Sequence, residues 1–348
     1  MTAAIQNPNE QLDTIAEFVR DRAAALDRGE TDIRTDLARI GELGLLENGL
    51  GGKCLDHMVA VIDGIAAESL TVGFSLWAQR MTLEYLDRAP EHLRARYCDE
   101  LASGRRVGVT AMAAALKYLA GLGELPLLAE RTDDGLTVSG PIHWASNVFP
   151  ESLIVFPART ADGGHVIAVV HADSPGIRIN SSPELLALGA TSSTSIAFEN
   201  VRIPASDVIS GDLTEFCGAI RPTFLLLQTS FCAGITRASL TEASARLHGL
   251  GEQFIDEYQV LTQQYESLRD RLYRFATAPS TVSGADLIRL RLDGSVVAVA
   301  ATRLEATLRG GAGYASASAT NRRFREAAFL PIQSPSEGQL RWELSKFE

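Results

Sequence analysis

The chain has 348 residues, 46% of them hydrophobic, with 43 acidic against 32 basic side chains and a formal net charge of −11. This apolar content excludes a disordered chain and is enough for one large domain or two to three modest ones. The acidic balance argues against binding of nucleic acid through a general positive field. No uncharged apolar run reaches the roughly 20 residues of a membrane span.

The start of the chain and its cysteines bear on location and metal binding. Residues 1–18 lack the basic start and apolar core of a signal peptide, so we expect a soluble, cytoplasmic protein. The cysteines show neither CxxC nor Cys/His spacing, and the six histidines are scattered, so we expect free thiols and no metal site. The cysteines are Cys54, Cys98, Cys217 and Cys232.

Residues 1–105 predict an N-terminal helical domain. Apolar residues recur at helical spacing from Leu12 to Val19. The long apolar stretch 58–86 predicts a buried hairpin of helices. Residues 90–104 begin with a proline in the first turn and end on a glycine, which is typical of a helix.

Residues 106–212 predict a central β domain, and residues 213–348 a C-terminal helical bundle. The central segments are short, rich in β-branched residues and bounded by turn residues, which favours a barrel or sandwich. Only the stretch 113–127 departs from this pattern and predicts a loop or short helix. Three long helices are then predicted over 223–249, 253–277 and 283–311. The fold class is therefore mainly α with a central β domain.

Four segments resemble motifs of a known family. They are IHWASN (142–147), LGATSSTSIAFENVRIPASDVI (188–209), GGAGY (310–314) with Arg325 downstream, and PIQSPSEGQ (331–339). With the order helices, β domain, helices, they resemble the acyl-CoA dehydrogenase family, whose C-terminal domain is a four-helix bundle. The resemblance implies an FAD-dependent oxidoreductase for an acyl-CoA or related acyl thioester. It also implies a homodimer or homotetramer and an electron acceptor or reductase as partner.

The resemblance assigns residues to the flavin ring. It implies that Trp144 lies over the isoalloxazine and that the Ser146 hydroxyl bonds near the flavin N5. The family's Thr-Glu-Pro turn contacts the ring through its backbone. Met112 and Ala113 stand at the matching place, and because backbone donors do not depend on side chains, they are the expected contacts.

The dinucleotide half of the cofactor is assigned in the same way. Gly310 and Gly311 permit close approach of the backbone to a phosphate or adenine. Phe254 and Gln259 match the phenylalanine and glutamine of the family's pyrophosphate turn, which serves a neighbouring subunit. Gly251 stands where the family has an arginine. FAD, weakened FAD binding, FMN or no flavin all remain open at this point.

The family's catalytic base is replaced in this chain. Removal of the substrate α-proton needs a carboxylate, and its usual position holds Gln333, whose amide has almost no basicity. An alternative position on the first bundle helix falls at about Phe224, and Glu337 matches the family's second glutamate. Three functions compete: an acyl-CoA dehydrogenase-like flavoprotein, a flavin-dependent monooxygenase of the same fold, and a non-catalytic subunit of a hetero-oligomer.

Overall fold

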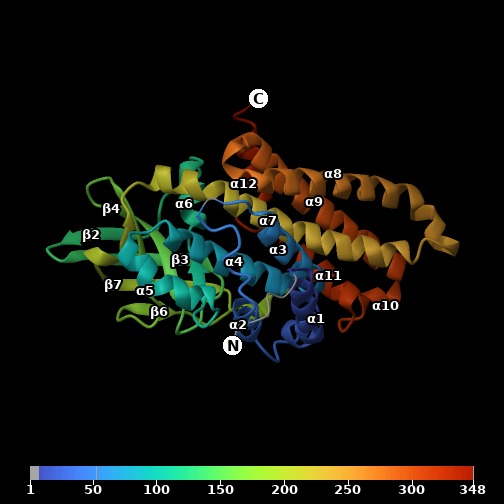
Figure 1. Cartoon of the computed structure of the whole chain (residues 1–348), viewed down its shortest axis with the longest axis horizontal. Coiled ribbons are helices and arrows are strands. Elements are labelled where there is room, and N and C mark those ends of the chain that lie inside the picture. The colour runs from blue at the N-terminus through green and yellow to red at the C-terminus, as the bar shows by residue number, and fades with distance from the viewer. Residues whose placement is uncertain (1–7, 52, 348) are drawn as a thin grey trace.

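The protein is divided along its long axis between a sheet and a set of long helices (Figure 1). The computed structural model describes residues 8–51 and 53–347; the stretch 1–7, on which the expected lack of a signal peptide partly rests, lies outside them. Within these residues no helix is both long and apolar enough to cross a membrane. The same residues contain no group of three or more His, Cys, Asp or Glu suited to a metal ion.

The N-terminal part is helical, as predicted. Its helices are α1 (Pro8–Asp27), α2 (Arg34–Glu42), α3 (Asp56–Glu68), α4 (Leu70–Asp87) and α5 (Glu91–Ala102). The expected hairpin of helices is α3 and α4, which are separated at Ser69: its backbone is extended and its side chain accepts a hydrogen bond from the Val72 N–H. Residues 70–86 of α4 are all buried, so this helix lies in the interior.

The central strands form one sheet with the order β6-β7-β3-β2-β4-β5-β8, and β1 pairs with β4. The strands are β1 (Gly108–Thr110), β2 (Leu128–Thr132), β3 (Gly135–Ala145), β4 (Leu153–Thr160), β5 (His165–His171), β6 (Ile177–Ile179), β7 (Thr194–Pro204) and β8 (Val208–Ser210). The segment after β1 is a short helix, α6 (Ala113–Leu119), one of the two expected outcomes. The sheet has its own apolar core, in which the Phe156 and Phe198 rings contact each other edge to face.

The C-terminal part contains three long helices and three short ones. They are α7 (Leu213–Ser244), α8 (Ile255–Thr277), α9 (Gly284–Arg309), α10 (Gly311–Tyr314), α11 (Ala319–Ala327) and α12 (Glu337–Leu344). Helix α7 begins ten residues before its predicted start, because it continues through Pro222 and is capped by the Asp212 carboxylate, which accepts a hydrogen bond from the Glu215 N–H.

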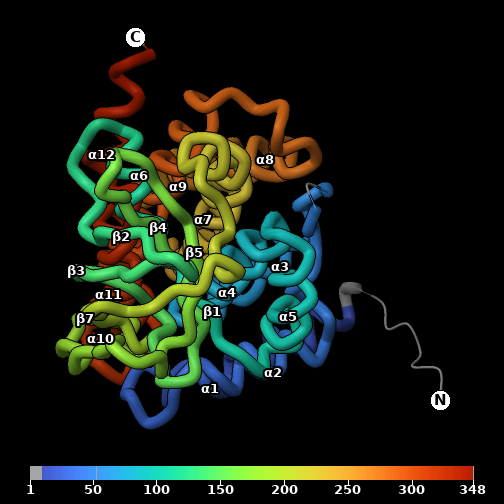
Figure 2. Tube along the Cα trace, turned by 90° about the vertical axis from the view of Figure 1, so that its left-hand side faces the viewer, coloured from blue at the N-terminus to red at the C-terminus, as the bar shows by residue number. Residues whose placement is uncertain are grey.

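Close packing between helices brings both ends of the chain into one core. Gly234 of α7 lies against α3, where a Cβ would come within 2.2 Å of the Asp63 carbonyl oxygen. At Gly294 of α9, a Cβ would lie 3.3 Å from the Cys232 Cβ of α7. Figure 2, viewed along the long axis, shows α12 beside α6, where the Trp342 indole donates a hydrogen bond to the Ala120 carbonyl oxygen.

Candidate functional site

A β-bulge turns Trp144 toward solvent. In β3 the register with β7 slips between Ile142 and Ala145, so that one extra residue is inserted in β3. Strict alternation after the buried Ile142 would bury Trp144, whereas the bulge leaves both His143 and Trp144 exposed. The Trp144 side chain is 62% exposed, and a large aromatic surface is therefore free to stack on a planar ligand.

The hydroxyl of Ser146 belongs to a chain of three hydroxyl groups. Its oxygen lies 2.6 Å from the Ser193 Oγ, which lies 2.7 Å from the Thr191 Oγ1. Thr191 donates to the Leu188 carbonyl oxygen at 2.7 Å. Because each hydroxyl has one proton, Ser193 donates to Thr191 and Ser146 donates to Ser193 in this arrangement. The Ser146 oxygen is then left as an acceptor.

Asn147 holds the end of β3 against its neighbours. Its backbone is left-handed, with φ of 64°, a conformation that asparagine tolerates better than most residues. Its Nδ2 donates to the Ser75 carbonyl oxygen of α4 at 3.0 Å and to the Gly108 carbonyl oxygen of β1 at 3.3 Å. No role was predicted for Asn147 from the sequence, although it is the last residue of the motif IHWASN.

The two residues expected to contact the ring through their backbone follow β1. Met112 is buried at the N-cap of α6, and Ala113 is its first residue. The N–H groups of a first helical turn have no partner within the helix, so that of Ala113 is available to a ligand. Asn147 ties β1 to the end of β3, which connects the segment before Met112 to the loop that follows Trp144.

The residues expected to bind the dinucleotide half lie near one another in the helical part. Phe254 ends a short 3-10 turn and packs against a small apolar cluster that includes Leu304 of α9. Gly310 follows α9 with φ of 63°, and a Cβ at Gly310 or Gly311 would meet nothing within 4 Å. Gln259 is exposed on α8.

Gly251 cannot be replaced by the family's arginine without a change in the turn. It is buried, and a Cβ there would come within 1.9 Å of the Arg246 carbonyl oxygen. The backbone of this turn leaves no room for a side chain at position 251. The family's arginine could therefore not be accommodated there without a different turn.

The two halves of the expected cofactor site are separated along the protomer. In Figure 1, β3 lies in the left half of the molecule and α10 near the right end. The ring residues and the dinucleotide residues of one protomer are thus apart, as the resemblance implies for a site shared between subunits.

Gln333 is held by a buried arginine that the sequence analysis missed. Arg291 of α9 is fully buried; its Nε donates to the Gln228 Oε1 at 3.0 Å, and its Nη2 donates to the Gln333 Oε1 at 2.9 Å and to the Leu330 carbonyl oxygen at 3.1 Å. The Gln228 amide also donates to the Ser334 carbonyl oxygen at 2.9 Å. Among the described residues Arg291 has no carboxylate partner, and burial lowers its pKa below the ordinary value.

Phe224, at the alternative base position, lies one helical turn before Gln228 and belongs to an aromatic cluster. This cluster consists of Phe74, Trp77, Phe224, Phe231 and Phe329. The Arg291 guanidinium lies 6.0 Å from the centroid of the Phe231 ring. Gln228, one turn after Phe224, thus connects the helix of one expected base position to the loop of the other, and neither position holds a base.

Glu337 lies at the start of α12, apart from this group. Its carboxylate accepts a hydrogen bond from the Arg341 Nε at 2.8 Å, four residues along the same helix, and this pair is partly exposed. Gln333 lies in the loop before α12, so the two residues do not share a helical face.

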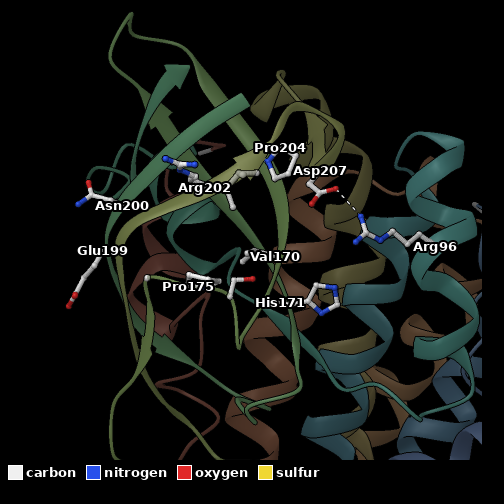
Figure 3. A pocket seen from close by; sticks show the side chains of 12 residues that line it. Arg96, Val170, His171, Pro175, Glu199, Asn200, Arg202, Pro204 and Asp207 are labelled. Carbon is white, nitrogen blue, oxygen red and sulfur yellow. Dashed lines mark hydrogen bonds and ion pairs between the residues drawn. The ribbon is translucent and has the colours of Figure 1, made fainter. Parts of the chain in front are cut away.

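One surface pocket is separate from these residues. It has a volume of 540 Å³ and lies between β7, the end of β5 and α5 (Figure 3). Arg96 and Asp207 form an ion pair across it at 3.4 Å, and Arg202 lies on its rim. Burial and the nearby Arg106 lower the pKa of His171. The residues lining it include none of the expected site residues.

Comparison with known proteins identifies the fold. No family model matches the chain. Over 272 residues the chain is 24% identical to benzylmalonyl-CoA dehydrogenase from Aromatoleum aromaticum, covering 72% of this chain and 71% of that protein. The structure matches butyryl-CoA dehydrogenase from Megasphaera elsdenii with a TM-score of 0.86 and 15% identity, over 100% of this chain and 99% of that one. The chain has the acyl-CoA dehydrogenase fold.

A further acyl-CoA dehydrogenase fold of known structure gives the same match. It is glutaryl-CoA dehydrogenase from Mycobacterium smegmatis in complex with FADH2, with a TM-score of 0.82 and 17% identity, covering 99% of this chain and 95% of that one. The fold class and the resemblance predicted from the sequence are thus confirmed. The individual site residues and the domain boundaries at 105 and 212 stay predictions.

In this fold, replacing Gln333 by glutamate gives Arg291 the counter-charge that it lacks. We expect Gln333→Glu to raise the free energy of unfolding by on the order of 1–3 kcal/mol, measured by urea unfolding at neutral pH. Arg291 would hold the folded pKa of the new carboxyl below its unfolded value of about 4.3. The gain is therefore present above that pH and lost as the pH falls through the folded pKa.

Gln339→Glu is the matched control for this variant. The Gln339 Nε2 donates to the Glu343 Oε1 at 2.9 Å and to the Leu116 carbonyl oxygen at 3.3 Å, so a carboxylate there would face two acceptors. This control should unfold at lower urea than the wild type. If Gln333→Glu lost as much free energy of unfolding as Gln339→Glu, the proposed effect of Arg291 would be contradicted.

Proposed function

We propose that the chain is an FAD-dependent oxidoreductase of the acyl-CoA dehydrogenase type that acts on an acyl-CoA or related acyl thioester. The main support is the bulge in β3, which exposes Trp144 beside the anchored loop at Asn147. Further support comes from the names of the three similar proteins given above, which are dehydrogenases of CoA thioesters, and from the FADH2 bound to one of them.

The residues present fit a flavin better at the ring than at the phosphates. When bound, FAD supplies an acceptor for a hydride. Trp144 would stack on its ring, and Ser146 and the backbone of Met112 and Ala113 would orient it. Absence of a cation at Gly251 predicts weaker binding of the dinucleotide half.

Gly310, Gly311, Phe254 and Gln259 of a second protomer would hold the dinucleotide half. This assignment makes a homodimer or homotetramer part of the proposal. The electron acceptor or reductase and the cytoplasmic location stay predictions from the sequence.

A monooxygenase of the same fold is the second candidate. It is favoured by Gln333 and Phe224, because neither side chain can accept an α-proton. The Gln333 amide oxygen is also already hydrogen-bonded to the Arg291 guanidinium. A monooxygenase reacts through oxygen and a separate reductase, and it needs no α-proton base. A non-catalytic subunit would be the function if the chain binds no flavin.

Loss of the Trp144 side chain should reduce flavin binding. Trp144→Ala removes a stacking surface worth on the order of 1 kcal/mol, so bound flavin should fall several-fold. The measurement is the ratio of flavin to protein after incubation with FAD and desalting. Trp342→Ala, another exposed tryptophan but on α12, should keep the wild-type ratio. Equal ratios in the two variants would contradict the role of Trp144, and a flavin-free wild type would favour the non-catalytic subunit.

Addition of a carboxylate at Gln333 should reveal whether the site performs dehydrogenation. General-base assistance is worth typically about 10²–10⁴-fold, and Arg291 should keep the gain near the lower end by weakening the base. Flavin-loaded Gln333→Glu should therefore be bleached faster than the wild type when mixed anaerobically with saturated acyl-CoAs of varied length. Gln339→Glu should not change the rate. No bleaching in flavin-loaded Gln333→Glu would favour the monooxygenase.

The expected homodimer or homotetramer can be tested without measuring flavin binding or catalysis. Apolar side chains on the outer faces of the helices, Val260 of α8, Val296 of α9 and Phe324 of α11, are exposed in the protomer. We expect light scattering at micromolar concentration to give at least twice the protomer mass of 37.4 kDa. A monomer under these conditions would exclude a flavin site completed by a second subunit.

A further inference from the structure

The group formed by Arg291, Gln228 and Gln333, called here the donor cluster, has more hydrogen-bond donors than acceptors. Arg291 uses both amide oxygens, those of Gln228 and Gln333. The buried nitrogen atoms left over are the Arg291 Nη1 and the Gln333 Nε2, and neither has a partner in the part of the chain that the structure describes. Both are N–H donors, so the missing partner is an acceptor.

The orientation of the two amides follows from chemistry. Arginine has five N–H donors and no acceptor, so each glutamine must turn its oxygen toward it. The Gln228 amide nitrogen then reaches the Ser334 carbonyl oxygen, whereas that of Gln333 reaches nothing. The cluster also has a net charge of +1, since its protein partners are neutral.

Another buried arginine of this chain has the negatively charged partner that Arg291 lacks. Arg80 is also fully buried, but its Nη1 donates to the Glu84 carboxylate at 2.9 Å. Burial of an unpaired charge costs several kcal/mol, so an uncompensated guanidinium at Arg291 favours capture of an anion.

The donor cluster lies where the family resemblance expects the acyl group of the substrate to bind. Gln333, where the family resemblance expects a base, is a member of the cluster, and Phe224, the alternative position, lies one helical turn before Gln228. Gln333 is 4% exposed and directly follows Ile332, which is 71% exposed. Phe329, the half-buried member of the aromatic cluster, accepts a hydrogen bond from the Gln333 N–H through its carbonyl oxygen.

We propose that the donor cluster binds a carboxylate carried by the acyl group of the substrate, which makes the substrate the CoA thioester of an acid with a second carboxyl group. This inference rests on the proposed function for the thioester, but the donor cluster itself requires only a carboxylate. Arg291 supplies the charge, and the Gln333 amide supplies a second donor to the same anion. The binding is non-covalent.

The test compares CoA thioesters of equal carbon number with and without a terminal carboxylate. The pairs are succinyl-CoA with butyryl-CoA and glutaryl-CoA with valeryl-CoA, titrated by calorimetry into the FAD-loaded protein. Wild type should bind the carboxylated member of at least one pair tighter by on the order of tenfold or more. Arg291→Met should abolish this preference, and Arg291→Lys should retain part of it.

Arg289→Met is the matched control, because Arg289 lies on the same helix but is exposed. It should keep the wild-type preference. A preference that survives in Arg291→Met would overturn the proposal, since the carboxylate would then bind elsewhere.

A second measurement needs no thioester. Sodium propionate should raise the urea midpoint of the wild type relative to sodium chloride at equal ionic strength, and Arg291→Met should show no such difference. Thioester binding without preference, together with no propionate effect, would overturn the inference and leave the proposed function intact. A propionate effect with no binding of any thioester would support the carboxylate site and contradict the acyl-CoA function.

Discussion

The buried guanidinium of Arg291 determines how three segments meet. Its hydrogen bonds connect α9 to α7 through Gln228 and to the loop before α12 through Leu330 and Gln333. The close approach of α7 and α9 at Gly294, one turn along from Arg291, allows this reach. Because the resemblance places the family's base in this loop, the interaction that holds the loop also limits what Gln333 can do. Its amide oxygen accepts the hydrogen bond from Arg291, and its buried Nε2 has no partner among the described residues.

The ring half of the expected flavin site depends on a different kind of constraint. Trp144 is exposed because β3 has one extra residue relative to β7 between Ile142 and Ala145, and Asn147 stabilises the end of this segment by bonding to α4 and β1. The dinucleotide half depends on a turn so tight that Gly251 can carry no side chain. The residues expected for the two halves lie apart in one chain, which is why the proposed site includes a second copy.

The sequence predicted well those elements that depend on the spacing of apolar residues within one segment. The helices α3, α4, α8 and α9 follow from apolar periodicity, and the tryptophan motif in 142–147 was visible as a string. The start of α7 was placed too late because a proline usually ends or begins a helix, whereas α7 continues through Pro222. Exposure of Trp144 could not be predicted, since it depends on the register between two strands that are about 50 residues apart in the chain.

Arg291 shows most directly why the site was only partly predictable. In the sequence it stands between Arg289 and Asp293 and looks like one more surface charge. Leu287, Gly294 and Ala298 stand on the same helical face as Arg291, at spacings of three and four residues, and this pattern was a usable signal for an inward arginine. Its partners, however, are 63 and 42 residues away, and only the tertiary structure shows that both are amides.

The replacement of glutamate by glutamine changes the charge of the interior as well as removing a base. A glutamate at position 333 would pair with Arg291 and make the group neutral, and the pair would need nothing from a ligand. With glutamine the positive charge stays, and the leftover polar atoms are donors. A neutral acyl chain can satisfy neither the charge nor the donors, whereas a carboxylate satisfies both. The same substitution that weakens the case for α-proton removal therefore strengthens the case for an acidic substrate.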